Sequence, residues 1–222
     1  MKINKFIAEF VGTGILAATV VGSGIMATSL TKDVAVQLLV VAIATVFILA
    51  VLIQMLAPIS GAHFNPAVSL VDFLNKGLSA KKLVLYVIAQ VFGGVLGVIT
   101  ANAMFELPGI QPSAHARSGA GLWLGEVVAT AGLILVIQLV GTQKSGKYIP
   151  FAVAGWIGAA YFFTSSTSFA NPAVTIARAF SDTFSGIKLS SVSGFVGAQI
   201  VGALIGYALV LYFTSEKAEN HE

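Results

Sequence analysis

Long apolar segments separated by short polar connections dominate the pattern of hydrophobic and polar positions along this chain. Six of them are long enough to cross a membrane, at about residues 6–28, 35–57, 83–105, 119–141, 149–167 and 190–213. A membrane-spanning helix needs roughly 20 apolar residues. The pattern therefore predicts an all-α membrane protein with six transmembrane helices.

Two shorter apolar stretches remain, at residues 65–75 and 171–181. As helices, each would be roughly 16 Å long, enough for half of a ~30 Å hydrocarbon core. Irregular backbone at that depth is tolerated only where protein or a water-filled cavity surrounds it. We interpret both stretches as re-entrant half-helices.

Both half-helices begin with the same tripeptide, Asn65-Pro66-Ala67 in the first and Asn171-Pro172-Ala173 in the second. An Asn side chain caps the first helical turn, and Pro at the first helical position gives up only an N–H that had no partner. A single Asn-Pro pair is a common turn or helix start. Two at equivalent places of a repeated sequence indicate two helix starts built alike, and that arrangement predicts a pore.

The spans repeat as well. Glu9 in the first span is matched by Glu126 in the fourth, and Gln90 in the third by Gln199 in the sixth. Acids inside spans are costly and often functional. Their matched placement favours structural braces, which accept hydrogen bonds from the re-entrant backbone, over the alternative of a proton relay.

We therefore expect one channel domain, residues 1–222, built from two repeats at about 1–110 and 111–222. Each repeat holds three spans, which is an odd number, so the second enters the membrane from the opposite side. The two half-helices then dip in from opposite faces, and their Asn-Pro starts meet near the midplane.

Composition agrees with a membrane setting, since 57% of the residues are hydrophobic, 9% are charged and the mean hydropathy is +0.92. The absence of Cys excludes disulfides, thiolate metal sites and Cys nucleophiles. We expect no cofactor and no metal. The net charge of +3 does not indicate nucleic acid, because the basic residues are scattered between the apolar spans.

Those basic residues predict the orientation. One side of the membrane would carry Lys2, Lys5, Lys76, Lys81, Lys82, Lys144, Lys147 and Lys217, and the other Lys32, Arg117, Arg178 and Lys188. Lys and Arg are enriched in cytoplasmic loops. The bias predicts a multi-pass protein of the inner (plasma) membrane with both termini in the cytoplasm.

The predicted midplane has a definite chemistry. Two facing helix N-termini place roughly half a positive charge each at the narrowest point. Asn65 and Asn171 can cap their helices and still present N–H donors to the lumen. A cation would meet a barrier there, and a proton relay would be interrupted. The expected function is passage of water and small neutral solutes across the lipid bilayer.

These residues resemble the aquaporins and glycerol facilitators, the major intrinsic protein family. The resemblance covers essentially the whole chain: the Ala-Glu-Phe-x-Gly-Thr start at residues 8–13, Ser60 to Val68, the Ala-Gln-x-x-Gly-Gly run at residues 89–94 and the second Asn-Pro-Ala. It implies an hourglass of six spans and two half-helices, assembled as a homotetramer with one pore per subunit.

One departure concerns the selectivity filter. Members of the family normally carry Arg three residues after the second motif's Asn, where this chain has Val174. Ungapped alignment puts Thr45, Ala159 and Ser168 at the other filter positions. All are small, so we expect a wide filter that admits glycerol-like solutes or metalloid hydroxides. The stretch around the second motif also resembles a bacterial subgroup sometimes associated with arsenic-resistance genes.

Two residues are expected in the vestibules. His63 comes just before the first half-helix and is expected in the cytoplasmic pore wall, or else packed in the interior. Arg178 follows Val174 by one helical turn, on the same face and toward the outer mouth. It either faces the lumen or pairs with Asp182.

Two other classes of function stay open from the sequence. A secondary transporter also uses inverted repeats and broken helices, but it would usually need an ion-coupling site, and the deep acids are already assigned as braces. An enzyme is disfavoured because no nucleophile motif, metal cluster or phosphate loop is present in the sequence.

Overall fold

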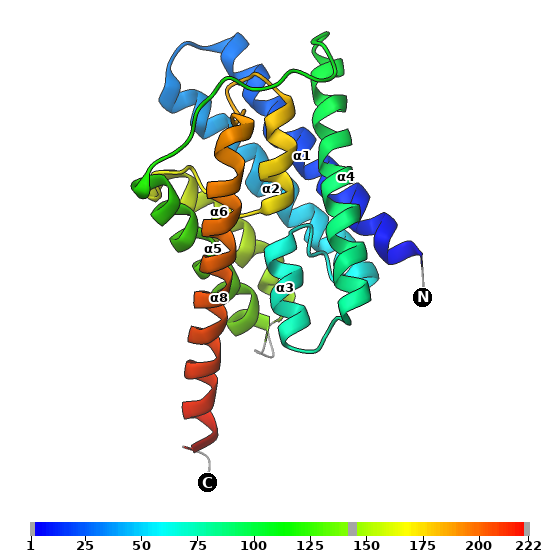
Figure 1. Ribbon diagram of the computed structural model, residues 1–222, viewed down its shortest axis with the longest axis vertical. Helices are drawn as coiled ribbons and strands as arrows, with labels where there is room; N and C mark the ends of the chain where they lie inside the picture. The colour runs from blue at the N-terminus through cyan, green and yellow to red at the C-terminus, as the bar shows by residue number, and fades with distance from the viewer. Residues whose placement is uncertain (1–2, 142–145, 220–222) are drawn as a thin grey trace.

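The computed structural model describes residues 3–141 and 146–219 as helices joined by loops (Figure 1). Lys2 and Lys144 lie outside the described residues, as does the side chain of Lys217. The first half contains α1 (Asn4–Leu30), α2 (Val34–Ser60), α3 (Pro66–Leu74) and α4 (Ala80–Met104).

The second half contains α5 (Ala120–Gly141), a 3-10 turn η1 (Gly146–Tyr148), α6 (Ile149–Phe163), α7 (Pro172–Ala177), a second 3-10 turn η2 (Arg178–Phe180) and α8 (Leu189–Glu219). Five helices in the described part are long and apolar enough to span a membrane, and α6 is a shorter apolar helix. The predicted fold class, six spans with two half-helices, is confirmed.

Two boundaries differ from the prediction. The fifth span was expected over 149–167, but α6 ends at Phe163, because Thr164 is extended and the chain turns back toward the second half-helix. The last span was expected to end near residue 213, whereas α8 continues to Glu219. The half-helices match closely, and the second finishes as the 3-10 turn η2.

Small residues set the closest helix contacts. α1 packs mainly on α4, and α5 on α8. A Cβ at Gly93 or Gly97 of α4 would collide with the carbonyl oxygens of Phe10 or Gly14 on α1. Gly202 and Gly206 on α8 lie in the same way against α5. Gly therefore allows each pair of helix backbones to approach closely, as in other membrane helix pairs.

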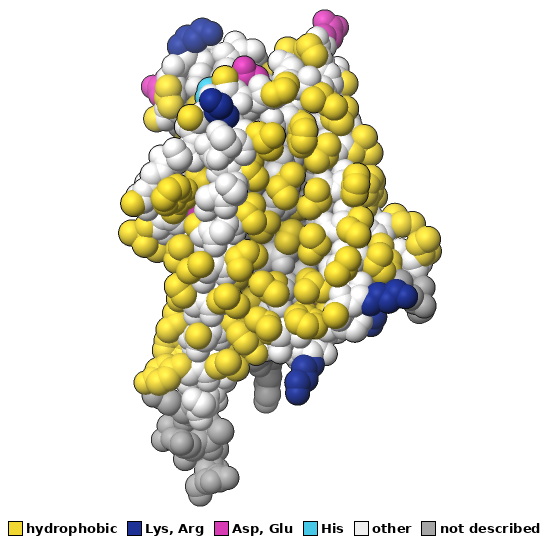
Figure 2. Space-filling model, viewed as in Figure 1, with side chains coloured by type: hydrophobic (Ala, Val, Ile, Leu, Met, Phe, Trp, Pro, Cys, Tyr) yellow, Lys and Arg dark blue, Asp and Glu magenta, His cyan; other side chains and the backbone are white. Residues whose placement is uncertain are grey.

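The surface is that of a protein surrounded by lipid. Figure 2 shows apolar side chains over the middle of the visible face and charged side chains near its two ends. Many large apolar side chains on the spans are exposed, including Phe47 on α2 and Phe92 on α4, at 69% and 66%. A band of this kind is stable only against hydrocarbon or another apolar surface.

Candidate functional site

The first half-helix is held by a buried carboxylate. Glu9 on α1 has no exposed surface, and each of its oxygens accepts two hydrogen bonds. Oε1 accepts from the Ser60 hydroxyl (2.6 Å) and the His63 N–H (3.0 Å). Oε2 accepts from the Phe64 N–H (2.6 Å) and from Gln90 Nε2 (2.8 Å). Glu9 thus fastens the segment before α3 to α1 and α4.

The second half repeats the arrangement. Glu126 on α5 is also fully buried; its Oε1 accepts from the Phe169 N–H (2.9 Å), and its Oε2 from the Ala170 N–H (2.8 Å) and Gln199 Nε2 (2.6 Å). Gln199 also donates to Thr175 Oγ1, as Gln90 does to Ser69 Oγ. All four residues expected as braces from the sequence make bracing contacts.

The segments held by the two Glu have unusual backbones. Ala62 and Phe64 in the first half, and Ser168 and Ala170 in the second, have φ between 46° and 51°. Non-Gly residues in this left-handed region cost of order 1–3 kcal/mol each and persist where the surroundings enforce them. Here the carboxylates bind the N–H groups that the unusual turns direct away from the lumen.

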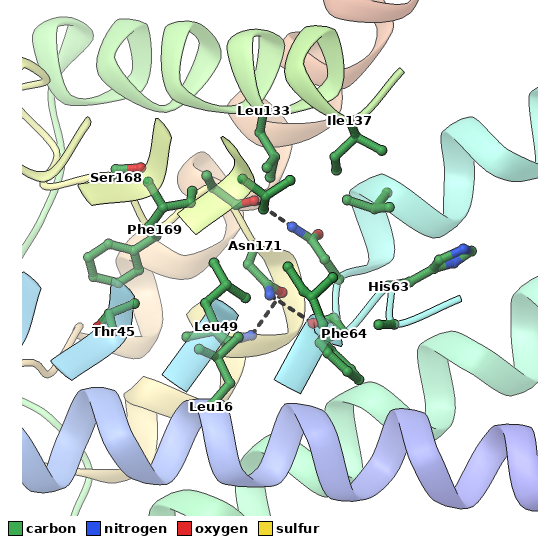
Figure 3. A pocket seen from close by; sticks show the side chains of 18 of the residues that line it. Leu16, Thr45, Leu49, His63, Phe64, Leu133, Ile137, Ser168, Phe169 and Asn171 are labelled. Carbon is green, nitrogen blue, oxygen red and sulfur yellow. Dashed lines mark hydrogen bonds between the residues drawn. The ribbon is translucent and has the colours of Figure 1, made fainter. Parts of the chain in front are cut away.

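The two Asn-Pro-Ala motifs join the halves at the centre (Figure 3). Asn65 Oδ1 caps α3 by accepting from the Ala67 N–H (2.9 Å), and its Nδ2 donates to the Ala170 carbonyl (2.7 Å). Asn171 caps α7 in the same way, and its Nδ2 donates to the Phe64 carbonyl (2.8 Å). Each Asn therefore caps its own half-helix and holds the other segment.

A cavity of about 190 Å³ runs past both motifs. In Figure 3, Thr45, Ser168 and Phe169 lie at one end, Asn171 in the middle and His63 at the other end. Its walls are stripes of residues spaced four apart on four helices: Leu16 and Val20 of α1, Thr45, Leu49 and Ile53 of α2, Leu133 and Ile137 of α5, and Val153, Ile157 and Tyr161 of α6. Between the ends, the stripes on these four helices are thus almost entirely apolar, and Asn65 and Asn171 supply polar groups opposite them.

The outer end differs from the expected filter in one residue. Thr45, Ser168 and Val174 line the cavity as expected, but Ala159 does not, because it is exposed on the outside of α6. The cavity stripe on α6 passes through Ile157 and Tyr161, and Ala159 lies between them, roughly 200° around the helix from each. Assigning Ala159 to the filter was therefore wrong.

Tyr161 lines the cavity at this end instead, and its hydroxyl lies 3.1 Å from Thr45 Oγ1. The expectation that all residues of the filter are small is wrong as well, because Tyr161 and Phe169 bring two aromatic rings to the outer end. Ungapped alignment missed Tyr161 because the packing of α6, and not the spacing along the chain, decides which of its residues face the cavity.

Arg178 also lines the outer end, and 4% of its surface is exposed. Its Nε donates to the Ser185 carbonyl, and its guanidinium carbon lies 3.3 Å from the centre of the Phe169 ring. Asp182 instead accepts from the Ala114 N–H (2.9 Å) and lies 4.0 Å from His115. Of the two alternatives for Arg178, the structure has the lumen-facing one.

The inner end contains His63. Its Nδ1 lies 3.0 Å from Ser69 Oγ, and its Nε2 lies 3.8 Å from Asp72 Oδ2. The ring packs edge-on against Tyr86, with centroids 5.3 Å apart. His63 is therefore at once a cavity-lining residue, as expected from its place before α3, and a packed one.

Two half-helices that hold each other beside a cavity, in a bundle of apolar helices, are the arrangement of a membrane channel. Residues 1–164 match the family described as Major intrinsic protein. The chain belongs to this family.

Individual relatives agree. The chain is 50% identical over 207 residues to aquaglyceroporin AqpS of Rhizobium meliloti (strain 1021), covering 93% of this chain and 88% of that protein. It is 29% identical to aquaporin Z of Brucella melitensis over 92% of this chain and 95% of that one. The X-ray structure of the aquaglyceroporin from Plasmodium falciparum has the same fold, with a TM-score of 0.68 at 24% identity over 95% and 94% of the two chains.

Proposed function

We propose that the protein is a passive channel for water and small uncharged solutes such as glycerol, and that it excludes ions and protons. The observation that carries this proposal is the apolar cavity that passes both Asn-capped half-helix starts. The name of its 50% identical relative, an aquaglyceroporin, supports the same class of solute.

The midplane supplies the barrier in this proposal. The starts of α3 and α7 meet there through the Asn65 and Asn171 hydrogen bonds, and each contributes roughly half a positive charge. The facing amides offer N–H donors, so a passing water or hydroxyl is held as an acceptor. A cation is repelled, and a continuous proton relay is interrupted.

The outer end sets the size and polarity of the solute. Val174 places an aliphatic side chain where the family pattern leads us to expect a guanidinium, while the Tyr161 and Thr45 hydroxyls offer donors and acceptors. A polyhydroxy solute can face these hydroxyls and lay its carbon or metalloid side on Val174 and Phe169. Glycerol and metalloid hydroxides of similar size both fit this description.

A secondary transporter is the other candidate, and the braces speak against it. Such a carrier needs a group at the midplane that binds a coupling ion. The acids deep among the described residues are Glu9 and Glu126, whose oxygens all accept structural hydrogen bonds. An ion could bind them only by breaking the contacts that hold the half-helices.

We also propose the setting of the channel. Lys76, Lys81 and Lys82 flank the turn between α3 and α4, at the end of the bundle where the chain begins and ends in Figure 1. This bias supports cytoplasmic termini in a bacterial plasma membrane. The exposed apolar flanks support a homotetramer in the lipid bilayer, with one pore in each subunit.

Stopped-flow measurements on proteoliposomes test the proposal. The protein should raise water and glycerol permeability above that of empty vesicles, without saturation at low millimolar solute and without dependence on an ion gradient. Asn171→Asp should abolish most of both fluxes, because it puts a carboxylate at the narrowest point. Asn75→Asp, at the exposed end of α3, is the matched control. Flux that needs an ion gradient would instead identify a carrier.

A further inference from the structure

A second arginine lies close to the outer filter and belongs to a distant part of the chain. Arg117 is in the connection between the two halves, just before α5, and its guanidinium carbon is 5.2 Å from the centre of the Phe169 ring. Arg178, on η2, lies at 3.3 Å from the same ring centre. One aromatic side chain of the filter therefore has two guanidinium neighbours.

The two arginines also share a short stretch of backbone. Arg117 Nε donates to the Gly186 carbonyl (2.8 Å) and its Nη2 to the Phe184 carbonyl (3.2 Å). Arg178 Nε donates to the Ser185 carbonyl between them. Three consecutive carbonyls are thus occupied by two guanidinium groups. Ser185 in turn anchors this stretch to α1, because its hydroxyl donates to the Val20 carbonyl (2.8 Å).

Among the side chains that the structure describes, no carboxylate forms an ion pair with either arginine, and the buried Glu126 attracts both only at longer range. The ion pairs there are His63–Asp72 and His115–Asp182, and Asp182 faces Ala114 and not the arginines. Burial lowers the pKa of Arg117, because desolvation disfavours its charged form. Contacts of the guanidinium with carbonyl oxygens and with the face of the Phe169 ring offset part of this desolvation cost.

The guanidinium of Arg178 is the polar group at the filter that we consider for a solute. Among the described residues, Arg178 makes its hydrogen bond through Nε, so its terminal nitrogens have no hydrogen-bond partner there, and Arg178 as a residue lines the cavity. Ser168 is 3% exposed, and its hydroxyl has no hydrogen-bond partner in the described part of the chain. Its oxygen is itself buried, so the hydroxyl is not open to a solute in this conformation, although Ser168 as a residue lines the cavity.

We propose that Arg117 is a positioning residue of the selectivity filter: it fixes Phe169 and the 184–186 carbonyls so that Arg178, one turn outward from Val174, presents its guanidinium to solute oxygens opposite Ser168. This inference rests on the proposed channel function. It assigns to the filter a solute with hydroxyl groups, one of which accepts a hydrogen bond from Arg178.

The physical reason for two arginines is geometric. Arg178 alone has a long flexible side chain, and one Nε hydrogen bond leaves its head free to swing toward the outer solvent. Arg117 restricts it in three ways: it repels the second cation, it supports the ring on which that cation lies, and it fixes the carbonyls on either side of Ser185. The planar fork of Arg can bridge two carbonyls, whereas the ammonium of Lys acts as a point charge.

The test compares the ratio of glycerol to water permeability in proteoliposomes for the full-length protein and four variants. Arg178→Ala and Arg117→Gln should both lower the ratio by at least about threefold, since a hydrogen bond from a charged group to the solute is lost or misplaced. Arg117→Lys should lower it as well, because it keeps the charge but not the fork. Lys188→Gln, an exposed cation of the same outer side, should leave it unchanged.

A double-mutant cycle separates positioning from general damage. In an Arg178→Ala background, Arg117→Gln should cause no further change in the ratio, because Arg117 acts through Arg178. If Arg117→Gln does not fold, as judged by thermal unfolding in detergent, Phe169→Leu removes the shared ring instead and should give the same fall.

The outcomes distinguish this inference from the proposed function. A protein that conducts glycerol with a ratio unaffected by Arg117→Gln and Arg178→Ala would overturn the inference and leave the channel intact. Additive effects in the cycle, or an Arg117→Lys variant identical to the parent, would also overturn the positioning role. A parent protein that conducts neither water nor glycerol would overturn the proposed function itself.

Discussion

Glu9 and Glu126 are fully buried acids in a chain that crosses a membrane, and the oxygens of both accept hydrogen bonds. A buried carboxylate is tolerated when its lone pairs are occupied, and here two backbone N–H groups and an amide supply each with hydrogen bonds. The same bonds hold the left-handed turns at Phe64 and Ala170. The acid and the strained turn therefore stabilise each other.

Replacing Glu126 by Gln should destabilise the fold without creating or removing a proton pathway. An amide has one acceptor oxygen, so either the Phe169 or the Ala170 N–H would face a donor and stay unsatisfied, at a cost of about 1–3 kcal/mol. Thermal unfolding in detergent should show a lower midpoint. Glu106→Gln, in the loop after α4, is the control. An unchanged midpoint together with altered proton flux would instead support a relay.

Val174 offers a second test at the level of one side chain. It is 4% exposed and lines the cavity one turn below Arg178. Val174→Arg adds bulk and a third guanidinium beside Arg178 and Arg117, so glycerol flux should fall by more than water flux. Val174→Leu adds bulk alone, so its glycerol flux in stopped-flow assays should be intermediate between those of the parent and of the Arg variant. Equal losses of both fluxes would contradict a filter at this position.

Among the helices, close packing depends on positions without a side chain. α4 crosses α1 through Gly93 and Gly97, and α8 crosses α5 through Gly202 and Gly206. The half-helices then lie against these pairs, α3 and α7 both contacting α4 and α8. Any separation of a crossing pair would therefore move the half-helices and the cavity between them.

Gly97→Ala should lower the thermal midpoint of the detergent-solubilised protein, because its Cβ would collide with the Gly14 carbonyl oxygen. Overpacking of this kind typically costs about 1–3 kcal/mol. Gly197→Ala is the matched change on α8, where no heavy atom lies within 4 Å of the added Cβ, and should leave the midpoint equal or higher. If both variants behave alike, the close crossing does not limit stability.

The whole molecule is two halves that meet at the Asn motifs and are linked by one connection. That connection also binds the end of the second half-helix at the outer face: the N–H groups of Gln111 and Ser113 donate to the carbonyls of Phe180 and Ala179 (3.0 Å each). With Arg117 it covers the second half-helix from outside. At the inner end, α3 is followed instead by the short turn that joins it to α4.

The orientation of the molecule can be tested directly, because the chain has no Cys. Lys188→Cys and Lys32→Cys, both exposed, should react with a membrane-impermeant maleimide in intact cells. Lys81→Cys, exposed at the other end, should react only after the membrane is opened. This outcome would place both termini in the cytoplasm; the reverse labelling pattern would refute that orientation.

Sequence reasoning alone recovered the spans, the two half-helices, both Asn motifs and the four bracing residues. These depend on local rules: the length of an apolar run, the cap that an Asn forms within one turn, and the cost of an acid in lipid. The exchange of Tyr161 for Ala159 could not be read in this way. Tyr161 and Ala159 are two positions apart on α6, and yet one faces the lumen and the other the outside of the bundle. The packing of α6 against its neighbours decides which of the two faces the lumen.

Arg117 shows the same division most clearly. From the sequence it was one of four Lys and Arg residues assigned to the outer side, and its charge carried information only about orientation. The tertiary structure brings it to Phe169 and to the carbonyls beside Ser185, which lie 52 or more positions further along the chain. Local patterns thus determined the class of protein and its central motifs, whereas the outer filter was decided by long-range packing, because its residues meet only when both halves are assembled.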